Sequence, residues 1–286
     1  MKGIILAGGT GSRLWPSTIA ISKQLIPVYD KPLIYYPLST LMLAGIREIL
    51  VITTPQDNLQ FKKLLGDGSA FGIELNYAIQ DRPDGLAQAF LIGEDFVKAD
   101  NVALILGDNV FHGAGLGRQL LKFSDPRGAV IFGYEVKDPQ KYGVAEVNSV
   151  GFVVSIEEKP INPKSSLAIP GLYFFDNSVI ARAKTVKKSK RGELEITSVL
   201  ESYLSSNNLE LVKIQRGTSW MDCGTVRSLN DASNYIRAIE DRQNHKVACI
   251  EEIALNQGWI TTAKLNQRIS ALGKNEYSEY LGRLIT

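Results

Sequence analysis

The chain has 286 residues, of which 44% are hydrophobic and 22% charged, a composition typical of an ordered protein with a large core. Lys and Arg number 32 against 30 Asp and Glu, and the net charge of +2 excludes a broad electrostatic attraction to nucleic acid. The first apolar run spans about five residues, too short for a signal-peptide core, and no stretch approaches a membrane span of roughly 20 residues. We therefore expect a cytoplasmic protein without nucleic-acid or membrane partners.

Cysteine and histidine are scarce, with Cys223, Cys249, His112 and His245 the only examples in the sequence. Their spacings match no zinc motif, and two cysteines cannot build a disulfide framework. Cys223 has no neighbouring His in sequence, so we expect it to be a small packed residue rather than a nucleophile.

The first half of the chain alternates short β-branched runs with helical patterns, which is typical of a parallel sheet. The expected strands are 3–6, 49–53, 74–79 and 102–106, and the expected helices are 35–44, 57–65, 85–96 and 116–123. The strand at 102–106 is apolar throughout, as expected when both faces of a strand are buried.

After residue 123 the pattern changes to strands joined by short turns, which predicts an antiparallel insertion over about 129–175. Its strands are expected at 129–136, 143–148, 153–157 and 172–175, with Asn148 to Gly151 as a hairpin turn. An α/β pattern then returns, with helices near Ser178 and at 196–204 and a strand at 209–214. The fold predicted is a Rossmann-like α/β core of mostly parallel strands over 1–225, followed by a C-terminal helical region over 226–286.

A glycine-rich turn directly follows the first strand, with the sequence Leu-Ala-Gly-Gly-Thr-Gly-Ser-Arg-Leu over residues 6–14. Glycines let the backbone approach a ligand, and consecutive amides can bind an anion. The turn lacks the Gly-Lys-Ser/Thr ending of a Walker A loop. Arg13 and Lys23 add a bidentate donor and a point charge suited to phosphate.

Two aspartates follow strands at positions suited to a metal ion. Asp108 lies at the carboxyl end of the most apolar strand, where open α/β sheets bind their ligands. Asp222 lies between a strand and a helix later in the chain. Mg²⁺ prefers oxygen ligands and is shared with substrate phosphates, so Asp108 and Asp222 are the predicted metal ligands.

With these motifs, the sequence resembles bacterial glucose-1-phosphate thymidylyltransferases of the short, allosterically regulated type. The resemblance rests most strongly on residues 3–46, 80–90, 106–109, 157–160 and 220–225. It implies Mg²⁺-dependent transfer of a nucleotidyl group from dTTP to α-D-glucose 1-phosphate, giving dTDP-glucose and pyrophosphate by in-line displacement. The product would enter dTDP-rhamnose or other deoxysugar synthesis.

The resemblance also implies roles for individual residues. The catalytic residues would be Arg13, Lys23 and Lys159. The nucleotide would contact Leu6, Gly8, Gly9, Thr10, Gly11, Ser12, Arg13, Gln24, Gln80, Pro83, Gly85 and Asp108, with Gln80 and Gly85 at the base. The sugar phosphate would contact Gly107, Tyr142, Gly143, Glu158, Lys159, Gly171, Tyr173, Thr197 and Trp220, mostly from the antiparallel insertion.

Alternatives remain open on the sequence alone. Cys223 stands where many relatives have Thr, and the segment 168–173 matches the family only in part. The same chemistry with UTP or another sugar 1-phosphate is one alternative, and a non-catalytic nucleotide-sugar sensor is another. Resemblance over 249–281 implies a homotetramer with feedback inhibition by a dTDP-sugar, although amphipathic packing explains the apolar spacing there.

Overall fold

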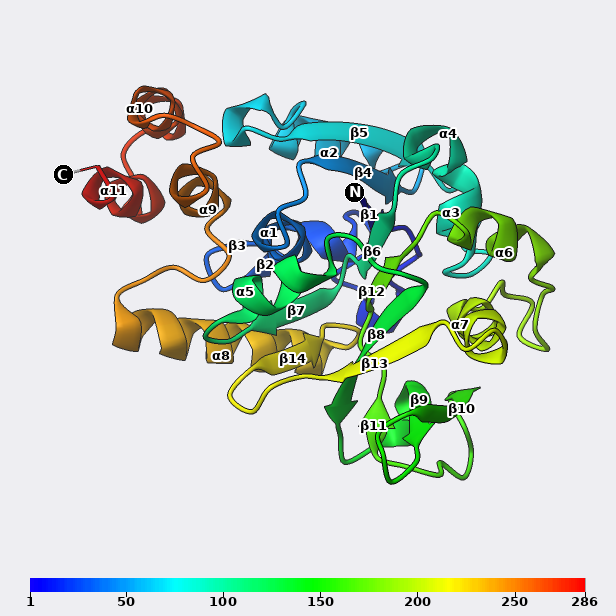
Figure 1. Ribbon diagram of the computed structural model, residues 1–286. Coiled ribbons are helices and arrows are strands. Elements are labelled where there is room, and N and C mark those ends of the chain that lie inside the picture. The colour runs from blue at the N-terminus through cyan, green and yellow to red at the C-terminus, as the bar shows by residue number, and fades with distance from the viewer. Residues whose placement is uncertain (286) are drawn as a thin grey trace.

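A ten-stranded mixed sheet forms the centre of the computed structural model, which describes residues 1–285 (Figure 1). Its strands are β1 (Lys2–Ala7), β4 (Glu48–Thr53), β5 (Glu74–Ile79), β6 (Val102–Leu106), β8 (Ala129–Glu135), β9 (Gly143–Val147), β10 (Val153–Glu158), β11 (Leu167–Ala168), β12 (Leu172–Phe175) and β13 (Leu209–Lys213). The order is β10-β9-β11-β8-β12-β6-β1-β4-β5, with β13 paired to β8. Strands β6, β1, β4 and β5 are parallel, whereas β12 is antiparallel to both β6 and β8.

Helices cover both faces of the parallel strands, because apolar side chains of these strands point to both faces of the sheet in alternation. In β1, Ile5 and Ala7 join one hydrophobic cluster, while Ile4 and Leu6 join another. Helices of the first cluster are α1 (Tyr35–Leu43), α2 (Asn58–Leu65), α5 (Leu116–Leu120), α9 (Ile250–Asn256), α10 (Thr262–Leu272) and α11 (Glu276–Arg283). Helices of the second are α3 (Gln88–Ile92), α4 (Glu94–Val97), α6 (Val179–Thr185) and α7 (Ile196–Ser205).

Two small antiparallel pairs lie outside the main sheet, and neither was expected from the sequence. Strand β7 (Asn109–His112) pairs with β14 (Ser219–Asp222), and β2 (Pro27–Val28) pairs with β3 (Lys31–Pro32). Helix α8 (Val226–Gln243) packs on them through a third cluster that contains Val110, Cys223 and Ile236. The prediction that Cys223 is a buried packing residue is confirmed.

Most predicted elements are confirmed to within a few residues, including antiparallel pairing between 129 and 175. The amide of Gly151 donates to the carbonyl of Asn148 at 2.9 Å in the predicted hairpin. A continuous helix over 85–96 is wrong: α3 begins at Gln88, and Gly93 separates it from α4. Gly85 has a φ of +113°, which an α-helix cannot accommodate.

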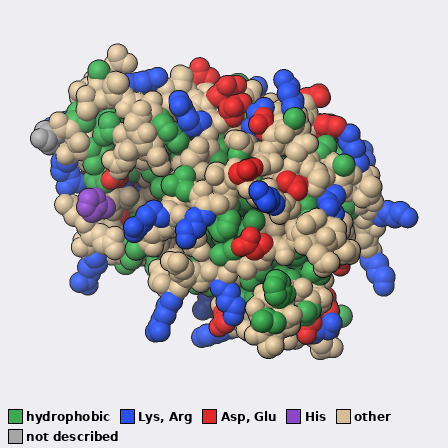
Figure 2. Space-filling view, in the orientation of Figure 1, with side chains coloured by type: hydrophobic (Ala, Val, Ile, Leu, Met, Phe, Trp, Pro, Cys, Tyr) green, Lys and Arg blue, Asp and Glu red, His purple; other side chains and the backbone are tan. Residues whose placement is uncertain are grey.

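The region after residue 226 is helical, as predicted, with glycines following α9 and α10. Helices α9, α10 and α11 lie together at one end of the molecule (Figure 1). None of the helices in residues 1–285 has the length and apolar character that a membrane span requires. Figure 2 shows Lys and Arg side chains interspersed with Asp and Glu on the visible face.

Candidate active site

The predicted glycine-rich turn and Asp108 leave the sheet side by side. Strands β1 and β6 are parallel, with Leu6 opposite Leu106. The turn after β1 and the Gly107–Asp108 segment therefore meet at the carboxyl edge of the sheet. A cavity of about 360 Å³ opens at this edge.

The cavity brings together nineteen of the residues that the sequence predicts for the site. They are Leu6, Gly8, Gly9, Arg13, Lys23, Gln24, Gln80, Pro83, Gly85, Asp108, Tyr142, Gly143, Glu158, Lys159, Gly171, Tyr173, Thr197, Trp220 and Asp222. They come from the ends of the parallel strands and the segments that follow them, from the antiparallel insertion, from α7 and from the β7–β14 pair. Residues predicted for the nucleotide, the sugar phosphate and the metal thus share one cavity.

Four predicted residues do not line the cavity: Thr10, Gly11, Ser12 and Gly107. The Gly11 carbonyl instead accepts a hydrogen bond from the Thr18 hydroxyl at 2.7 Å. At Gly107 an added Cβ would lie 3.0 Å from the Gln24 side chain, so this glycine permits close packing beneath the site. Contacts of these residues with a bound substrate remain predictions.

Ten further residues line the cavity that were not predicted from the sequence. They are Leu86, Leu106, Asn109, Lys141, Ile169, Arg191, Glu193, Glu195, Ile196 and Leu200. Several lie beside residues that were predicted, so proximity in sequence could have identified them. Arg191 had no such signal, because it lies in a charged segment that is typical of a solvent-exposed loop.

Asp108 forms an ion pair with Lys23, and both side chains are largely buried. Its second oxygen, Oδ1, accepts a hydrogen bond from Asn109 Nδ2 at 2.9 Å. Burial by itself would raise the pKa of Asp108, but the charge and hydrogen bond of Lys23, with the Asn109 amide, hold that pKa below its usual value. Asp108 is therefore ionised at neutral pH.

Asp222 reaches the same place through the pairing of β14 with β7, in which it lies opposite Asn109. The adjoining amide of Cys223 donates to the carbonyl of Asp108 at 2.9 Å. Burial and the charge of Asp108 raise the pKa of Asp222 to about 6, against the opposing charges of Lys23, Arg13 and Lys159. The two carboxylates repel each other, so additional positive charge beside them favours the state in which both are ionised.

The two aspartates fit Mg²⁺ as a shared ion. Residues 1–285 hold no group of three or more His, Cys, Asp or Glu side chains that could bind a metal by themselves. Mg²⁺ usually takes one or two carboxylates and completes its coordination with water and substrate phosphates. The Asp108 and Asp222 carboxylates supply that number of protein ligands beside the turn of Gly8 and Gly9.

Gln80 is buried and packs against the glycine-rich turn at the cavity. Its Nε2 donates to Gln88 Oε1 at 2.7 Å. A Cβ added at Gly8 would lie 2.2 Å from Gln80 Oε1, so only glycine at position 8 lets this side chain pack against the turn. The Gln80 amide is therefore positioned at the cavity by the same turn that carries the predicted phosphate amides.

The part of the cavity lined by the antiparallel insertion combines aromatic rings with charged groups. The rings of Tyr142 and Trp220 contact each other with centroids 5.0 Å apart. Glu158 Oε1 lies 3.7 Å from Lys159 Nζ and 3.5 Å from Arg191 Nη1. Burial raises the pKa of Glu158, with Lys159 opposing and Glu195 adding to this effect. A carboxylate beside two cations suits a ligand that carries both hydroxyl groups and phosphate.

This arrangement of a cavity, a glycine-rich turn and paired aspartates on an α/β sheet agrees with comparisons with known proteins. The sequence profile of the family described as nucleotidyl transferases matches residues 2–239. The chain belongs to the nucleotidyl transferase family.

Relatives of similar length define the group within that family. A glucose-1-phosphate thymidylyltransferase of Mycobacterium tuberculosis is 54% identical over 285 residues, covering 100% of this chain and 99% of the relative. The enzyme of the same name from Neisseria meningitidis is 53% identical, with the same coverage. The predicted membership of the glucose-1-phosphate thymidylyltransferases is confirmed.

Solved structures agree with the fold. A Bacillus anthracis protein, described provisionally as a glucose-1-phosphate thymidylyltransferase and solved with sucrose, is 40% identical with a TM-score of 0.77. The match covers 83% of this chain and 95% of that one. A UDP-glucose pyrophosphorylase is only 24% identical, and its TM-score of 0.74, over 83% of this chain and 98% of that one, shows a shared fold alone.

Proposed function

We propose that this protein catalyses nucleotidyl transfer from dTTP to α-D-glucose 1-phosphate, giving dTDP-glucose and pyrophosphate. An oxygen of the sugar phosphate attacks the α-phosphorus of the nucleotide and forms a new P–O bond. The bond from the α-phosphorus to the bridging oxygen breaks, and its electron pair leaves with pyrophosphate. The relatives named above support this choice of substrates.

The chain's own groups act by positioning and by neutralising charge, because this chemistry needs no protein nucleophile. In the proposal, the amides around Gly8 and Gly9 and the Arg13 guanidinium hold the triphosphate. Lys23 lies beside Asp108 and offers its charge to the reacting phosphates. Lys159 holds the sugar phosphate, while Glu158 accepts hydrogen bonds from sugar hydroxyls.

Asp108 and Asp222 are the proposed ligands of Mg²⁺. When bound, the ion neutralises charge on the phosphates of the nucleotide. We expect metal binding to depend on nucleotide, since two carboxylates provide only part of the coordination.

One observation carries the proposal most directly: the register of β14 on β7 places Asp222 opposite Asn109, the residue that follows Asp108. Two carboxylates that repel each other are costly to stability, and such groups cluster at functional sites. Their position at the carboxyl edge of the sheet, with Lys23 and Arg13, supports phosphate chemistry.

The test is a pyrophosphate-release assay with glucose 1-phosphate and each nucleoside triphosphate in turn, with and without Mg²⁺. We expect turnover with dTTP that requires the metal. Turnover with UTP alone would overturn the thymidylyl assignment. Binding of dTDP-glucose without turnover of any nucleotide would favour the sensor.

Residue similarity over 249–281 supports three further parts of the proposal. The active form is a homotetramer, residues 226–286 are the helical region that assembles it, and a dTDP-sugar inhibits it. Analytical ultracentrifugation tests the oligomeric state. Titration of the assay with dTDP-rhamnose tests the inhibition, and a rate independent of this sugar would contradict it.

A further inference from the structure

Two loops that contribute residues to the cavity lining are hydrogen-bonded to each other. One follows β5 and contains Asp84, Gly85 and Ala87; the other connects α6 to α7 and contains Leu194. The Leu194 amide donates to the Asp84 carbonyl at 2.6 Å, and the Ala87 amide donates to the Leu194 carbonyl at 3.0 Å. These two bonds enclose Gly85 and resemble a short piece of antiparallel ladder.

Gly85 is required by this contact. A Cβ added there would lie 2.4 Å from both the backbone nitrogen and the backbone oxygen of Leu194, and its φ of +113° disfavours any other residue. The family resemblance implied that Gly85 contacts the base of the nucleotide. The structure gives a different physical reason, which is the close approach of the second loop.

A side-chain contact crosses the same junction. Lys188 Nζ lies 3.0 Å from Asp84 Oδ1. Asp84, Gly85, Ala87, Lys188 and Leu194 together form a connection that we term the loop clasp. Other main-chain hydrogen bonds of residues 187–194 in the described part of the chain are internal to that loop.

The loop held by the clasp carries charged groups to the sugar-phosphate end of the cavity. Arg191 Nη1 lies 3.5 Å from Glu158 Oε1 and 3.4 Å from Glu195 Oε1. Glu195 Oε1 also accepts a hydrogen bond from Ser189 Oγ at 2.8 Å. The position of Arg191 and Glu195 relative to Glu158 thus depends on a loop whose main-chain anchor is on the nucleotide side.

We propose that the loop clasp is a positioning device for the sugar-phosphate half of the site, anchored in the nucleotide half. Asp84, Lys188 and Leu194 act through Arg191 and Glu195 and touch neither substrate themselves. The assignment of Glu158 to the sugar rests on the proposed function. Weakening the clasp raises the KM for glucose 1-phosphate, although Asp84 and Gly85 belong to the loop assigned to the nucleotide.

Steady-state kinetics of Lys188→Met and Gly85→Ala test the proposal. Removing an exposed ion pair costs up to about 1 kcal/mol, so Lys188→Met raises the KM for glucose 1-phosphate about 2- to 5-fold. Gly85→Ala raises it by roughly tenfold or more, because the clash displaces the backbone of Leu194. In Lys188→Met, kcat and the KM for dTTP stay within about twofold of wild type, since the metal ligands and the base-side loop are intact.

Lys184→Met is the matched control, because Lys184 forms a similarly exposed ion pair with Glu94 on the same side of the molecule, outside the cavity. We expect wild-type kinetics from it. Hydrogen exchange provides a readout that needs no turnover: residues 187–195 exchange faster in Lys188→Met than in Lys184→Met.

The two hypotheses fail in different ways. Wild-type protein without pyrophosphate release would reject the proposed function, while the exchange comparison would still test the clasp. Equal exchange in the two lysine variants would overturn the clasp. A rise only in the KM for dTTP in Gly85→Ala would also overturn it and would return Gly85 to a base contact.

Discussion

Trp220 Nε1 donates a 2.6 Å hydrogen bond to Oδ1 of Asn109, a buried residue that connects several parts of the site. The same oxygen accepts from the Gly171 amide at 3.0 Å, and the Asn109 amide donates to Asp108. Asn109→Leu leaves two buried N–H groups without an acceptor, at about 1–3 kcal/mol each. We therefore expect the free energy of unfolding to fall by about 2–6 kcal/mol in urea denaturation.

Asn76→Ala is the control for that measurement. Asn76 lies on β5, and its side-chain amide donates a hydrogen bond to the exposed Glu74. Its free energy of unfolding should change by less than about 0.5 kcal/mol. Equal effects of the two substitutions would mean that Asn109 does not organise the site.

Asp108→Asn and Asp222→Asn should both lower turnover by about a hundredfold or more, but with different effects on stability. The lowered pKa of Asp108 means that its ionised form stabilises the fold, so Asp108→Asn lowers the free energy of unfolding. The pKa of Asp222 is raised to about 6, so its charge opposes folding at pH 7 and Asp222→Asn preserves or increases stability. Urea denaturation in metal-free buffer compares them; lower stability of Asp222→Asn than of Asp108→Asn contradicts this electrostatic account.

Gly8 and Gln80 should be energetically coupled. Gly8→Ala places a Cβ 2.2 Å from Gln80 Oε1 and displaces that side chain. We expect Gly8→Ala and Gln80→Ala each to raise the KM for dTTP roughly tenfold, and the double variant to resemble either single one. The non-additivity would be about 1.4 kcal/mol, one factor of ten. Additive effects would show that position 8 acts on the nucleotide independently of Gln80; Gln60→Ala, on the exposed side of α2, is the neutral control.

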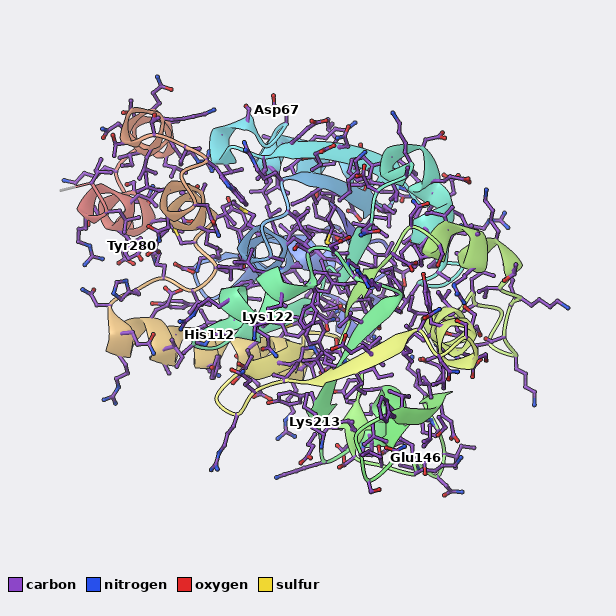
Figure 3. All side chains as sticks on the ribbon, in the orientation of Figure 1. Asp67, His112, Lys122, Glu146, Lys213 and Tyr280 are labelled. Atoms are coloured by element: carbon purple, nitrogen blue, oxygen red, sulfur yellow. The ribbon has the colours of Figure 1, made fainter. Side chains whose placement is uncertain are left out.

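His112 should make the protein less stable in mild acid. It lies beside α8 (Figure 3), with Nδ1 3.0 Å from the Tyr235 hydroxyl. Burial lowers its pKa, with Glu240 opposing. Below an unfolded-state pKa of about 6.5 the unfolded chain binds more protons than the folded one, so stability is full above that pH and falls as pH decreases.

Urea denaturation at several pH values between 7.5 and 5.5 measures this loss in an Asp222→Asn background, because Asp222, with a pKa of about 6, titrates in the same range with the opposite effect on stability. His112→Asn should reduce the slope. His245→Asn changes the other histidine, which is exposed, and should leave the slope as in wild type. Equal slopes in all three proteins would reject the role of His112.

The C-terminal helices should depend on one buried ion pair. Glu251 on α9 is fully buried, and its carboxylate accepts from Arg268 Nε at 3.1 Å and from the Tyr277 hydroxyl at 2.7 Å. Arg268→Met removes the cation and leaves a buried charge, at about 3 kcal/mol in the free energy of unfolding. Arg237→Met removes an exposed pair with Asp241 and should cost less than about 0.5 kcal/mol. An effect of Arg268→Met as small as that of Arg237→Met would contradict the role of this ion pair.

The local features of the fold were accessible from the sequence because they depend on neighbouring residues. The apolar run over 102–106 identified a strand buried on both faces, and the glycine-rich turn identified a segment that lines the cavity. The β7–β14 pair was not accessible, since strands of four residues lack a periodic signal. The loop around Arg191 and the true start of α3 were missed for a related reason: both depend on the contact between Gly85 and Leu194, which are distant in sequence.

The sequence by itself determined which chemical groups are present and that Asp108 and the glycine-rich turn follow buried strands. Residue types and strand ends are encoded locally, by hydrophobic periodicity and by glycine. Only the tertiary structure decided that Asp222 lies beside Asp108 and that the two sides of the cavity are joined at Leu194. Those contacts depend on the register of a short ladder and on one close backbone approach, both of which form between segments brought together by packing of the whole sheet.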